Sequence, residues 1–247
     1  MIKDLEFLLK KLFLNEKFLL KKRLKRAIKN NYEKELIIID KFENKNRSAI
    51  DIGVYRGVYS YKLSKLFKHV YAYEPNPLIF PYLEKNLYKI IKNLTLKNFA
   101  LSNSSGNVDL KIPHRSKSIF KDNIEELYRL GWATIHENKN YSSYDKIQVK
   151  KIKLDEDLKN IDIGFIKIDV EGHEKEVIEG ATNLILNSKP ILLIEIIEEH
   201  SGRPVSETIN FIRDLGYSPY ICKDSDIYNV EKFKNLDQEN NFFFLPN

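Results

Sequence analysis

Short apolar runs alternate with amphipathic segments along most of the chain. The runs have the length of buried strands, whereas the segments between them repeat their apolar residues every three or four positions, which is typical of helices. Strand, turn and helix at this spacing predict parallel βαβ units with right-handed crossovers, and hence a doubly wound, mostly parallel α/β sheet. We expect seven strands in it, at residues 48–52, 69–73, 94–100, 163–168, 191–197, 217–222 and 241–245, the last one running antiparallel.

The apolar run Ile163–Ile168 leads directly into a cluster of charged residues. Asp169 ends the run, Glu171 follows, and His173 begins a helix that we expect to continue to about Leu186. In open α/β sheets, ligands bind outside the carboxyl ends of the strands. The cluster is therefore where we expect a reacting centre.

A second apolar strand also ends in charge, and it neighbours the first in the expected topology. Glu195 lies near its end, and His200 follows. Two carboxylates that face one space either bind a cation or share a proton, and a histidine adds a nitrogen ligand or a base. Asp169, Glu195 and His200 are thus candidate ligands of a divalent metal ion. Alternatively, Asp169 and Glu195 cap helices or bind backbone amides, and Glu171 only braces the turn at Gly172.

A glycine turn separates the first expected strand from its helix. Its sequence, Asp51-Ile-Gly53-Val-Tyr-Arg-Gly57, lets the backbone approach a ligand closely. Glu74 ends the next strand, where an acidic residue accepts hydrogen bonds from ribose hydroxyls. The three glycines of a dinucleotide site, G-x-G-x-x-G, are absent here, which argues against NAD. Turn and acid together favour S-adenosylmethionine, whose ammonium group can use an acidic partner.

Several motifs between about Ala49 and Glu195 resemble those of the FkbM-type S-adenosylmethionine-dependent methyltransferases. They are D-I-G-x-x-x-G at 51–57, Y-A-Y-E-P-N-P at 71–77, N-F-A-L-S at 98–102, and I-K-I-D-V-E-G-H-E at 166–174 with E-G-A at 179–181. The motif at 166–174 is the most specific of these. The family usually has Ala-Asn after the first motif glycine, where this chain has Val54-Tyr55.

The resemblance implies a class I methyltransferase fold, which is Rossmann-like, and methyl transfer to a hydroxyl of a sugar or related small molecule. A sugar hydroxyl is a poor nucleophile near neutral pH, so a general base or a divalent cation must activate it. We expect Asp169 and His173 to act on the acceptor. The residues that the motifs imply for binding S-adenosylmethionine are Asp51, Gly53, Gly57, Glu74, Asn76 and Ala100.

The first 47 residues form a basic helical arm in our interpretation, and residues 48–247 form the methyltransferase domain. Residues 1–30 carry leucines on helical faces and many lysines and arginines between them, as a basic amphipathic helix does. The leucines either pack on the domain or on a second subunit, which would give a homo-oligomer. Alternatively, the arm makes weak contact with an acidic membrane surface.

The stretch from about 114 to 146 is mostly polar and basic, and it lies between strands expected at 108–112 and 147–154. Long segments of this kind are often functional lids, so we interpret it as the insertion that binds the acceptor. Trp132 suits stacking on a base or a sugar. The basic residues suit a nucleotide-linked sugar, for example of a surface polysaccharide pathway, and are Arg115, Lys117, Lys121 and Arg129. A solvated basic loop is the alternative.

Composition limits the location and the partners. The single cysteine, Cys222, excludes an intramolecular disulfide and fits a reducing compartment. No segment has the roughly 20 continuous apolar residues of a membrane span, so we expect a cytoplasmic protein. The net charge of +6 is moderate, and we expect no DNA binding. The alternative functions are an RNA methyltransferase and a non-catalytic protein that acts through its N-terminal arm.

Overall fold

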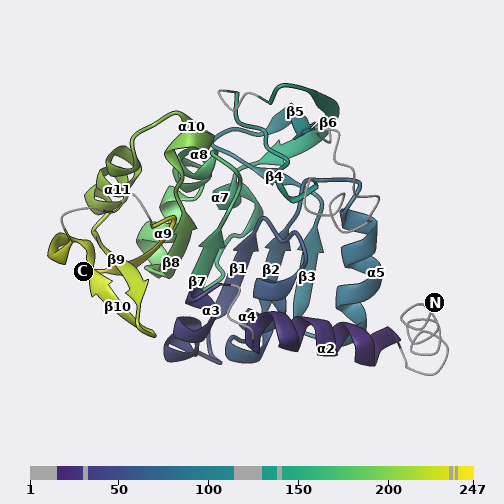
Figure 1. Ribbon diagram of the computed structural model, residues 1–247, viewed down its shortest axis with the longest axis horizontal. Coiled ribbons are helices and arrows are strands. Elements are labelled where there is room, and N and C mark those ends of the chain that lie inside the picture. The colour runs from purple at the N-terminus through teal and green to yellow at the C-terminus, as the bar shows by residue number, and fades with distance from the viewer. Residues whose placement is uncertain (1–15, 30–32, 114–129, 138–140, 234–235, 237–238) are drawn as a thin grey trace, which may run out of the picture.

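The computed structural model describes residues 16–29, 33–113, 130–137, 141–233, 236 and 239–247. A sheet of eight strands runs through the centre of these residues, in the order β10-β9-β11-β8-β7-β1-β2-β3 (Figure 1). Its strands are β1 Ser48–Ile52, β2 Val70–Tyr73, β3 Leu94–Lys97, β7 Ile163–Ile168, β8 Ile191–Glu195, β9 Tyr217–Lys223, β10 Asp226–Asn229 and β11 Asn241–Pro246. The strands from β8 to β3 pair in parallel, and β11 lies antiparallel between β8 and β9. The predicted class I methyltransferase sheet is therefore confirmed.

The strand that the sequence pattern does not predict is β10. It pairs with β9 in a hairpin whose two turn residues, Asp224 and Ser225, have φ angles of 49° and 61°. Turns with two positive φ angles match the twist of a hairpin and are normally marked by Asn-Gly or Asp-Gly. Because this turn has no glycine, it carries no clear sequence signal. The sheet consequently has eight strands instead of the expected seven.

The strand expected at 94–100 is divided between two sheets. β3 ends at Lys97, and β4, Ala100–Leu101, pairs with β6 in a separate sheet of order β4-β6-β5. The other strands of this small sheet are β5 Gly106–Pro113 and β6 Tyr144–Ile152, which are antiparallel. The small sheet lies beyond the carboxyl ends of the central parallel strands (Figure 1). It is therefore well placed to cover a site at that edge.

Helices cover both faces of the central sheet (Figure 1). One face carries α2 Glu16–Lys29, α3 Glu35–Ile38, the 3-10 turn η1 Ile39–Phe42, α4 Val58–Leu66 and α5 Phe80–Ile90. The other carries α7 Leu154–Asp157, α8 Glu174–Glu179, α9 Thr182–Ser188 and α11 Val205–Asp214, with α10 Glu198–Ser201 after β8 and the 3-10 turn η2 Val230–Lys232 before β11. Successive β1 residues alternate between the two cores, Ala49 in one and Ile50 in the other. This alternation makes the sheet doubly wound.

The helix expected from His173 to about Leu186 is interrupted and forms α8 and α9. Gly180 lies so close to the backbone of Ser102 that a Cβ atom there would stand 2.0 Å from the Ser102 carbonyl oxygen. The Asp155 carboxylate then accepts hydrogen bonds from the amides of Asn183 and Leu184 at 3.0 and 2.8 Å, at the start of α9. Contacts with distant segments, which helical periodicity does not reveal, therefore lie at the break between the two helices.

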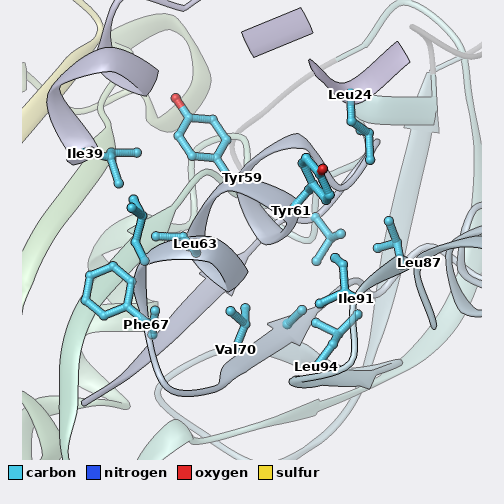
Figure 2. Close-up of a cluster of buried hydrophobic side chains, with 14 of the residues drawn as sticks. Leu24, Ile39, Tyr59, Tyr61, Leu63, Phe67, Val70, Leu87, Ile91 and Leu94 are labelled. Atoms are coloured by element: carbon cyan, nitrogen blue, oxygen red, sulfur yellow. The ribbon is translucent and has the colours of Figure 1, made fainter. Parts of the chain in front are cut away.

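Helix α2 packs on α4 and α5. Leu20 and Leu24 are buried, and Figure 2 shows Leu24 near Tyr61 and Leu87 in the same apolar cluster. The basic side chains on its other side are exposed and include Lys22, Arg23, Lys25 and Arg26. The described part of the expected arm thus adds to the core, whereas residues 1–15 lie outside the described residues. Within the described ranges, no helix combines the length and the apolar character needed to cross a membrane.

Candidate active site

Asp51, Lys167 and Asp169 form a line of charge on one face of the central sheet. Asp51 of β1 stands opposite Lys167 of β7 in the register of the two strands. Lys167 Nζ donates hydrogen bonds to Asp169 Oδ2 at 2.8 Å and to the Gly53 carbonyl oxygen at 3.2 Å. Burial alone would lower the pKa of Lys167, but the charges of Asp169 and Asp51 outweigh burial and raise that pKa. Lys167 is thus a buried cation that stays charged between two carboxylates.

The Asp51 carboxylate is fully buried and only partly satisfied. Its Oδ2 accepts a hydrogen bond from the Ser60 hydroxyl of α4, whereas Oδ1 has no hydrogen-bond partner among the described residues. Burial raises the pKa of Asp51 to about 6, against the opposing effects of Lys167 and Ser60. A buried oxygen without a partner is unfavourable. Asp51 Oδ1 is therefore suited to a donor from a ligand.

The glycine turn after β1 packs against the end of β7. Gly53 has a φ angle of +82°, and a Cβ atom there would stand 1.8 Å from the Asp169 carbonyl oxygen. Only glycine accommodates both conditions. Gly57, with a φ angle of +75°, immediately precedes α4. The turn consequently holds the backbone of β1 and the end of β7 together at the carboxyl edge of the sheet.

Glu74 and Asn76 follow β2 and are both buried. Glu74 Oε2 accepts a hydrogen bond from the Tyr55 amide, and its Oε1 accepts one from the Asn76 amide, each at 2.9 Å. Burial raises the pKa of Glu74 to about 7 despite these two bonds. The Asn76 side chain accepts from the Leu78 amide and donates to the Leu130 carbonyl oxygen, each at 3.0 Å. Asn76 therefore fastens the segment that begins at Leu130.

The side chains of Asp169 and Glu195 lie close enough to shift each other's pKa. Burial and the charge of Asp169 raise the pKa of Glu195 to about 10. Burial would also raise the pKa of Asp169, but Lys167 and the hydrogen bond from Glu195 outweigh it, so that this pKa is lowered. The opposite directions of the two pKa shifts favour one proton shared by the pair, with Asp169 as the more acidic partner. Proton sharing is one of the two arrangements expected of these carboxylates.

Glu171, rather than Asp169, lies beside His200. Its Oε2 is 3.1 Å from His200 Nδ1. Glu171, Glu195 and His200 each offer an atom within 4.8 Å of the other two, which is a spacing compatible with three ligands of one cation. The metal trio expected from the sequence therefore changes by one residue, because Asp169 is held by Lys167. A metal ion at this place stays a prediction.

A cavity of about 220 Å³ lies between the carboxyl edge of the central sheet and the segment that follows Leu130. The expected site residues that line it are Gly53, Glu74, Ala100, Asp169 and Glu195. Among the described residues, Asp51, Gly57, Asn76, His173 and His200 contribute no surface to it, although Asp51 and Asn76 are chain neighbours of lining residues. The cavity therefore connects the expected cofactor residues to the Asp169–Glu195 pair.

His173 belongs to a second polar cluster. Its Nε2 lies 3.0 Å from Ser102 Oγ, and its Nδ1 lies 3.6 Å from Glu176 Oε2. Its ring meets that of His136 in an edge arrangement, with 5.8 Å between the centroids and 61° between the ring planes. Burial lowers the pKa of His173 to about 4, despite the nearby Glu176 carboxylate. This position does not support the expected action of His173 on the acceptor, which stays a prediction.

Of the expected insertion at 114–146, residues 130–137 and 141–146 are described. Trp132, with 55% of its surface exposed, lines the cavity together with Thr134. The Thr134 hydroxyl donates to the Glu171 carbonyl oxygen at 2.8 Å, which joins this segment to the end of β7. The four basic residues expected to bind phosphate, Arg115, Lys117, Lys121 and Arg129, lie outside the described residues.

Lys167 is the main residue of the site that sequence reasoning missed. It interrupts an otherwise apolar strand, and it stands two positions before Asp169, so that both side chains lie on the same face of β7. This spacing is a usable signal for a buried ion pair. By contrast, Tyr55 and Thr134 reach the cavity only through the folding of loops, and no local pattern marks them.

The family model of the methyltransferase FkbM domain matches residues 51–219 of the chain. The matched range contains the glycine turn, Glu74 and the strand ends that carry Asp169 and Glu195. The chain belongs to the FkbM methyltransferase family. The resemblance inferred from the sequence motifs is thereby confirmed.

A curated relative of this FkbM domain is the hexuronic acid methyltransferase AglP of Haloferax volcanii, which is 26% identical over 155 residues. The alignment covers 63% of this chain and 57% of AglP. The chain thus spans little more than half of that relative's length.

Two solved structures resemble this FkbM domain. Methyltransferase FkbM from Methylobacillus flagellatus KT is 15% identical with a TM-score of 0.48, over 82% of this chain and 44% of the other. Precorrin-6y C5,15-methyltransferase from Geobacter metallireducens GS-15 is 15% identical with a TM-score of 0.43, over 86% and 84% of the two chains. The strand order of the central sheet, and not these similarities, defines the fold.

Proposed function

We propose that the protein transfers a methyl group from S-adenosylmethionine to a hydroxyl of a small glycosyl acceptor. The observation that carries this proposal is the cavity that Gly53 and Glu74 share with the Asp169–Glu195 pair. Membership of the FkbM family supports methyl transfer. The similarity to a hexuronic acid methyltransferase supports an acceptor derived from a sugar.

The ends of β1 and β2 fit S-adenosylmethionine, which supplies an electrophilic methyl group when bound. Asp51 is our candidate partner for the ammonium group, because its Oδ1 is buried and finds no partner in the described part of the chain. Since Asp51 contributes no surface to the cavity, this contact requires a local shift when the cofactor binds. Glu74 lines the cavity, and its oxygens retain lone pairs for ribose hydroxyls beyond the two amide bonds. Ala100 lines the same cavity with a side chain small enough to leave room beside the ligand.

Asp169 is the residue that we place against the acceptor hydroxyl. Lys167 holds its Oδ2, and Glu195 donates to the carboxylate, so the side chain is fixed while 35% of its surface stays exposed. Its lowered pKa keeps it ionised at neutral pH. The Asp169 carboxylate can therefore accept a hydrogen bond from the hydroxyl and take the proton as the hydroxyl oxygen becomes more acidic during transfer.

The other walls of the cavity suit a hydroxylated ring. Trp132 offers an exposed aromatic surface, and the Glu171 carboxylate can accept hydrogen bonds from hydroxyl groups. Because Glu74, Asp169 and Glu171 all line the cavity, an uncharged sugar ring fits these walls better than a phosphate group. A nucleotide-linked acceptor would place its phosphates elsewhere, and the basic residues between 114 and 129 are our candidates for them.

A divalent cation is the second way to activate a hydroxyl. Glu171, Glu195 and His200 would hold it, and its charge would lower the pKa of a bound hydroxyl. Binding would require Glu195 to lose its proton, so cation and proton compete for the same side chain. A chelator therefore separates the two mechanisms.

Transfer of a labelled methyl group tests the proposed function. The full chain is incubated with labelled S-adenosylmethionine and a panel of free and nucleotide-linked sugars, including hexuronic acids, with and without a chelator. We expect transfer to at least one sugar and cofactor binding in calorimetry. Absence of both cofactor binding and transfer would contradict the proposal. Transfer confined to an RNA included in the panel would replace the proposed acceptor.

The variant Asp169→Asn separates chemistry from binding. Its amide oxygen can still accept from Lys167, so we expect cofactor affinity to persist while turnover falls by about 100-fold or more, as for loss of a general base. The matched control is Asp162→Asn, at the other end of β7, where Asp162 pairs with Arg47 at 2.8 Å. The control should retain turnover. If cofactor affinity falls together with turnover in Asp169→Asn, Asp169 is a binding residue.

A further inference from the structure

His136, His173 and Glu176 converge outside the cavity from two distant segments. His136 belongs to the described segment 130–137, His173 immediately precedes α8, and Glu176 lies in α8. Each of the three offers one atom within 4.8 Å of those of the other two. The three residues, called the His136 cluster below, do not line the cavity on which the function proposed above rests.

The His136 and His173 rings each have one nitrogen within hydrogen-bond distance of a residue outside the cluster. His136 Nε2 lies 3.0 Å from the Ser201 carbonyl oxygen, to which it must donate, because a carbonyl oxygen only accepts. His173 Nε2 lies 3.0 Å from Ser102 Oγ. Ser102 Oγ is also 3.5 Å from Asn103 Oδ1, so the hydroxyl can donate to Asn103 while it accepts the proton of His173 Nε2, and we assign His173 this tautomer. Both imidazoles then present an Nδ1 lone pair.

The carboxylate of the cluster is arranged in the same way. Glu176 Oε1 accepts a hydrogen bond from Arg203 Nη2, which leaves Oε2 on the inner side. The hydrogen bond with Glu176, together with the charges of Glu207 and Glu179, raises the pKa of Arg203. The guanidinium charge is thus offset by surrounding carboxylates. Partners that orient the far atom of a ligand are typical of metal sites.

The inner atoms are buried and unsatisfied. His173 Nδ1 and Glu176 Oε2 are 3.6 Å apart, and neither has a hydrogen-bond partner in the described parts of the chain. That separation is too long for a hydrogen bond. It is close to the distance of about 3.3–3.4 Å between two atoms that bind one tetrahedral zinc ion at about 2.0–2.1 Å. A buried polar atom without a hydrogen-bond partner lowers the stability of the folded state, whereas a cation bound by both atoms would satisfy both.

We propose that His136, His173 and Glu176 bind a divalent transition-metal ion of the zinc type. Two imidazole nitrogens and one carboxylate oxygen favour such an ion over Mg²⁺ or Ca²⁺, which prefer oxygen ligands. The ion would tie the segment 130–137 to the start of α8. Thr134 and Glu171, which line the cavity, are joined by a hydrogen bond two residues before His136 and His173 respectively, so the ion would stabilise one wall of the cavity.

Metal titration of the chain without a histidine tag tests this site. After treatment with a chelator, the protein is titrated with Zn²⁺, and with Co²⁺ as an optical probe. We expect one equivalent to bind, visible ligand-field bands with Co²⁺, and a higher Tm with Zn²⁺. In Glu176→Gln and His173→Gln, affinity should fall by more than about 100-fold, beyond the loss typical of changes around a metal site.

Two control variants give the experiment its specificity. His69→Gln removes a histidine that contacts Thr95 and should bind Zn²⁺ normally. Glu195→Gln disables the separate group of Glu171, Glu195 and His200 in or beside the cavity and should also bind normally. Loss of binding in Glu195→Gln with retention in Glu176→Gln would overturn the proposal, because the ion would then lie at the cavity.

A measurement on the unsubstituted protein avoids dependence on the folding of variants. Long-range ¹H–¹⁵N spectra of the histidine side chains should show that Zn²⁺ shifts the Nδ1 resonances of two histidines while both Nε2 atoms stay protonated. Absence of Zn²⁺ binding at micromolar concentrations, or binding that leaves the histidine resonances unchanged, would overturn the proposal. Neither readout depends on methyltransferase activity.

Discussion

Asp169 and Glu195 are acids in the same cavity, yet they hold protons very differently. Lys167 lies 2.8 Å from Asp169 and stabilises its charge. Glu195 instead faces the charge of Asp169, and two carboxylates this close do not both ionise without a large electrostatic penalty. The position of one lysine therefore favours Asp169, rather than Glu195, as the ionised carboxyl group.

The raised pKa of Glu195 predicts a pH dependence of stability. Between pH 4.5, its ordinary value, and about 10, the folded protein keeps a proton that the unfolded chain releases. The free energy of unfolding therefore falls as pH rises through this range, by up to about 1.4 kcal/mol per pH unit from this group. Glu195→Gln removes this dependence and can still donate to Asp169. Relative to the unsubstituted protein, the variant should gain stability from pH 5 to pH 9 in urea unfolding.

Glu199→Gln is the control for this pH effect, because Glu199 is exposed and follows Glu195 closely in the chain. Its stability should track that of the unsubstituted protein over the same pH range. Other buried acids, such as Glu74 and Asp51, are present in all three proteins, so they cancel in the comparison. Equal slopes for Glu195→Gln and the unsubstituted protein would show that Glu195 is ionised.

Glu174, rather than Glu171, braces the turn that follows β7. Its Oε1 accepts hydrogen bonds from the amides of Gly172 at 3.0 Å and Val170 at 3.3 Å. Burial raises its pKa to about 7 against these bonds. Glu171 instead lies beside His200 and lines the cavity. The two glutamates of one short motif thus have different surroundings.

The turn between β1 and α4 leaves little room for substitution at Gly53. Gly53 combines a positive φ angle with contact against the backbone of Asp169. The turn also carries the Tyr55 amide that binds Glu74. A change at Gly53 therefore disturbs both the end of β7 and the expected ribose site.

We expect Gly53→Ala to destabilise the protein and to abolish cofactor binding. An alanine at this φ angle lowers the free energy of unfolding by about 1–2 kcal/mol. Displacement of the Asp169 backbone should lower it by a further 1–3 kcal/mol, roughly. Gly216→Ala is the matched control, because Gly216 has a φ angle of +86° but nothing within 4 Å of an added Cβ atom. Urea unfolding and calorimetry measure the two effects. A similar decrease in the free energy of unfolding in both variants would show that the contact with Asp169 does not contribute to stability.

Across the whole molecule, the cavity is made by segments that are distant in the chain. The ends of β1, β2, β7 and β8 form its floor, and the small sheet with residues 130–135 forms the opposite wall. Helix α2 packs on α4 and α5, on the face of the sheet opposite to α8 and α9, and completes the apolar core there. The stability of the site therefore depends on parts of the chain that never touch it.

Leu24→Ala tests whether α2 is part of the cooperative fold. Leu24 is 4% exposed, and its truncation should leave a cavity that lowers the free energy of unfolding by about 2–5 kcal/mol. Phe18→Ala, in the same helix but 54% exposed, should change stability much less. Urea unfolding measures both. Equal, small effects would mean that α2 is only loosely attached to the domain.

The sequence by itself determined the alternation of strands and helices, the fold class and most residues of the carboxyl edge. Buried strands such as Ile163–Ile168 leave continuous apolar runs, and Asp51, Glu74, Asp169 and Glu195 stand at or near the ends of such runs. These are local signals, because neighbouring residues alone determine the period of the hydrophobic pattern and the position at which an apolar run ends. The family motifs added the expected cofactor.

Tertiary structure alone decided how these residues divide their roles. Gly180, which follows α8, packs against the Ser102 backbone too closely for a side chain, and His173 lies beside Ser102 and His136 instead of lining the cavity. Asp169 faces Glu195 only because β7 and β8 lie side by side, and this contact lets Lys167 favour the ionised form of one of the two carboxyl groups. Each of these outcomes depends on a contact between segments far apart in the chain, and no local periodicity encodes such a contact.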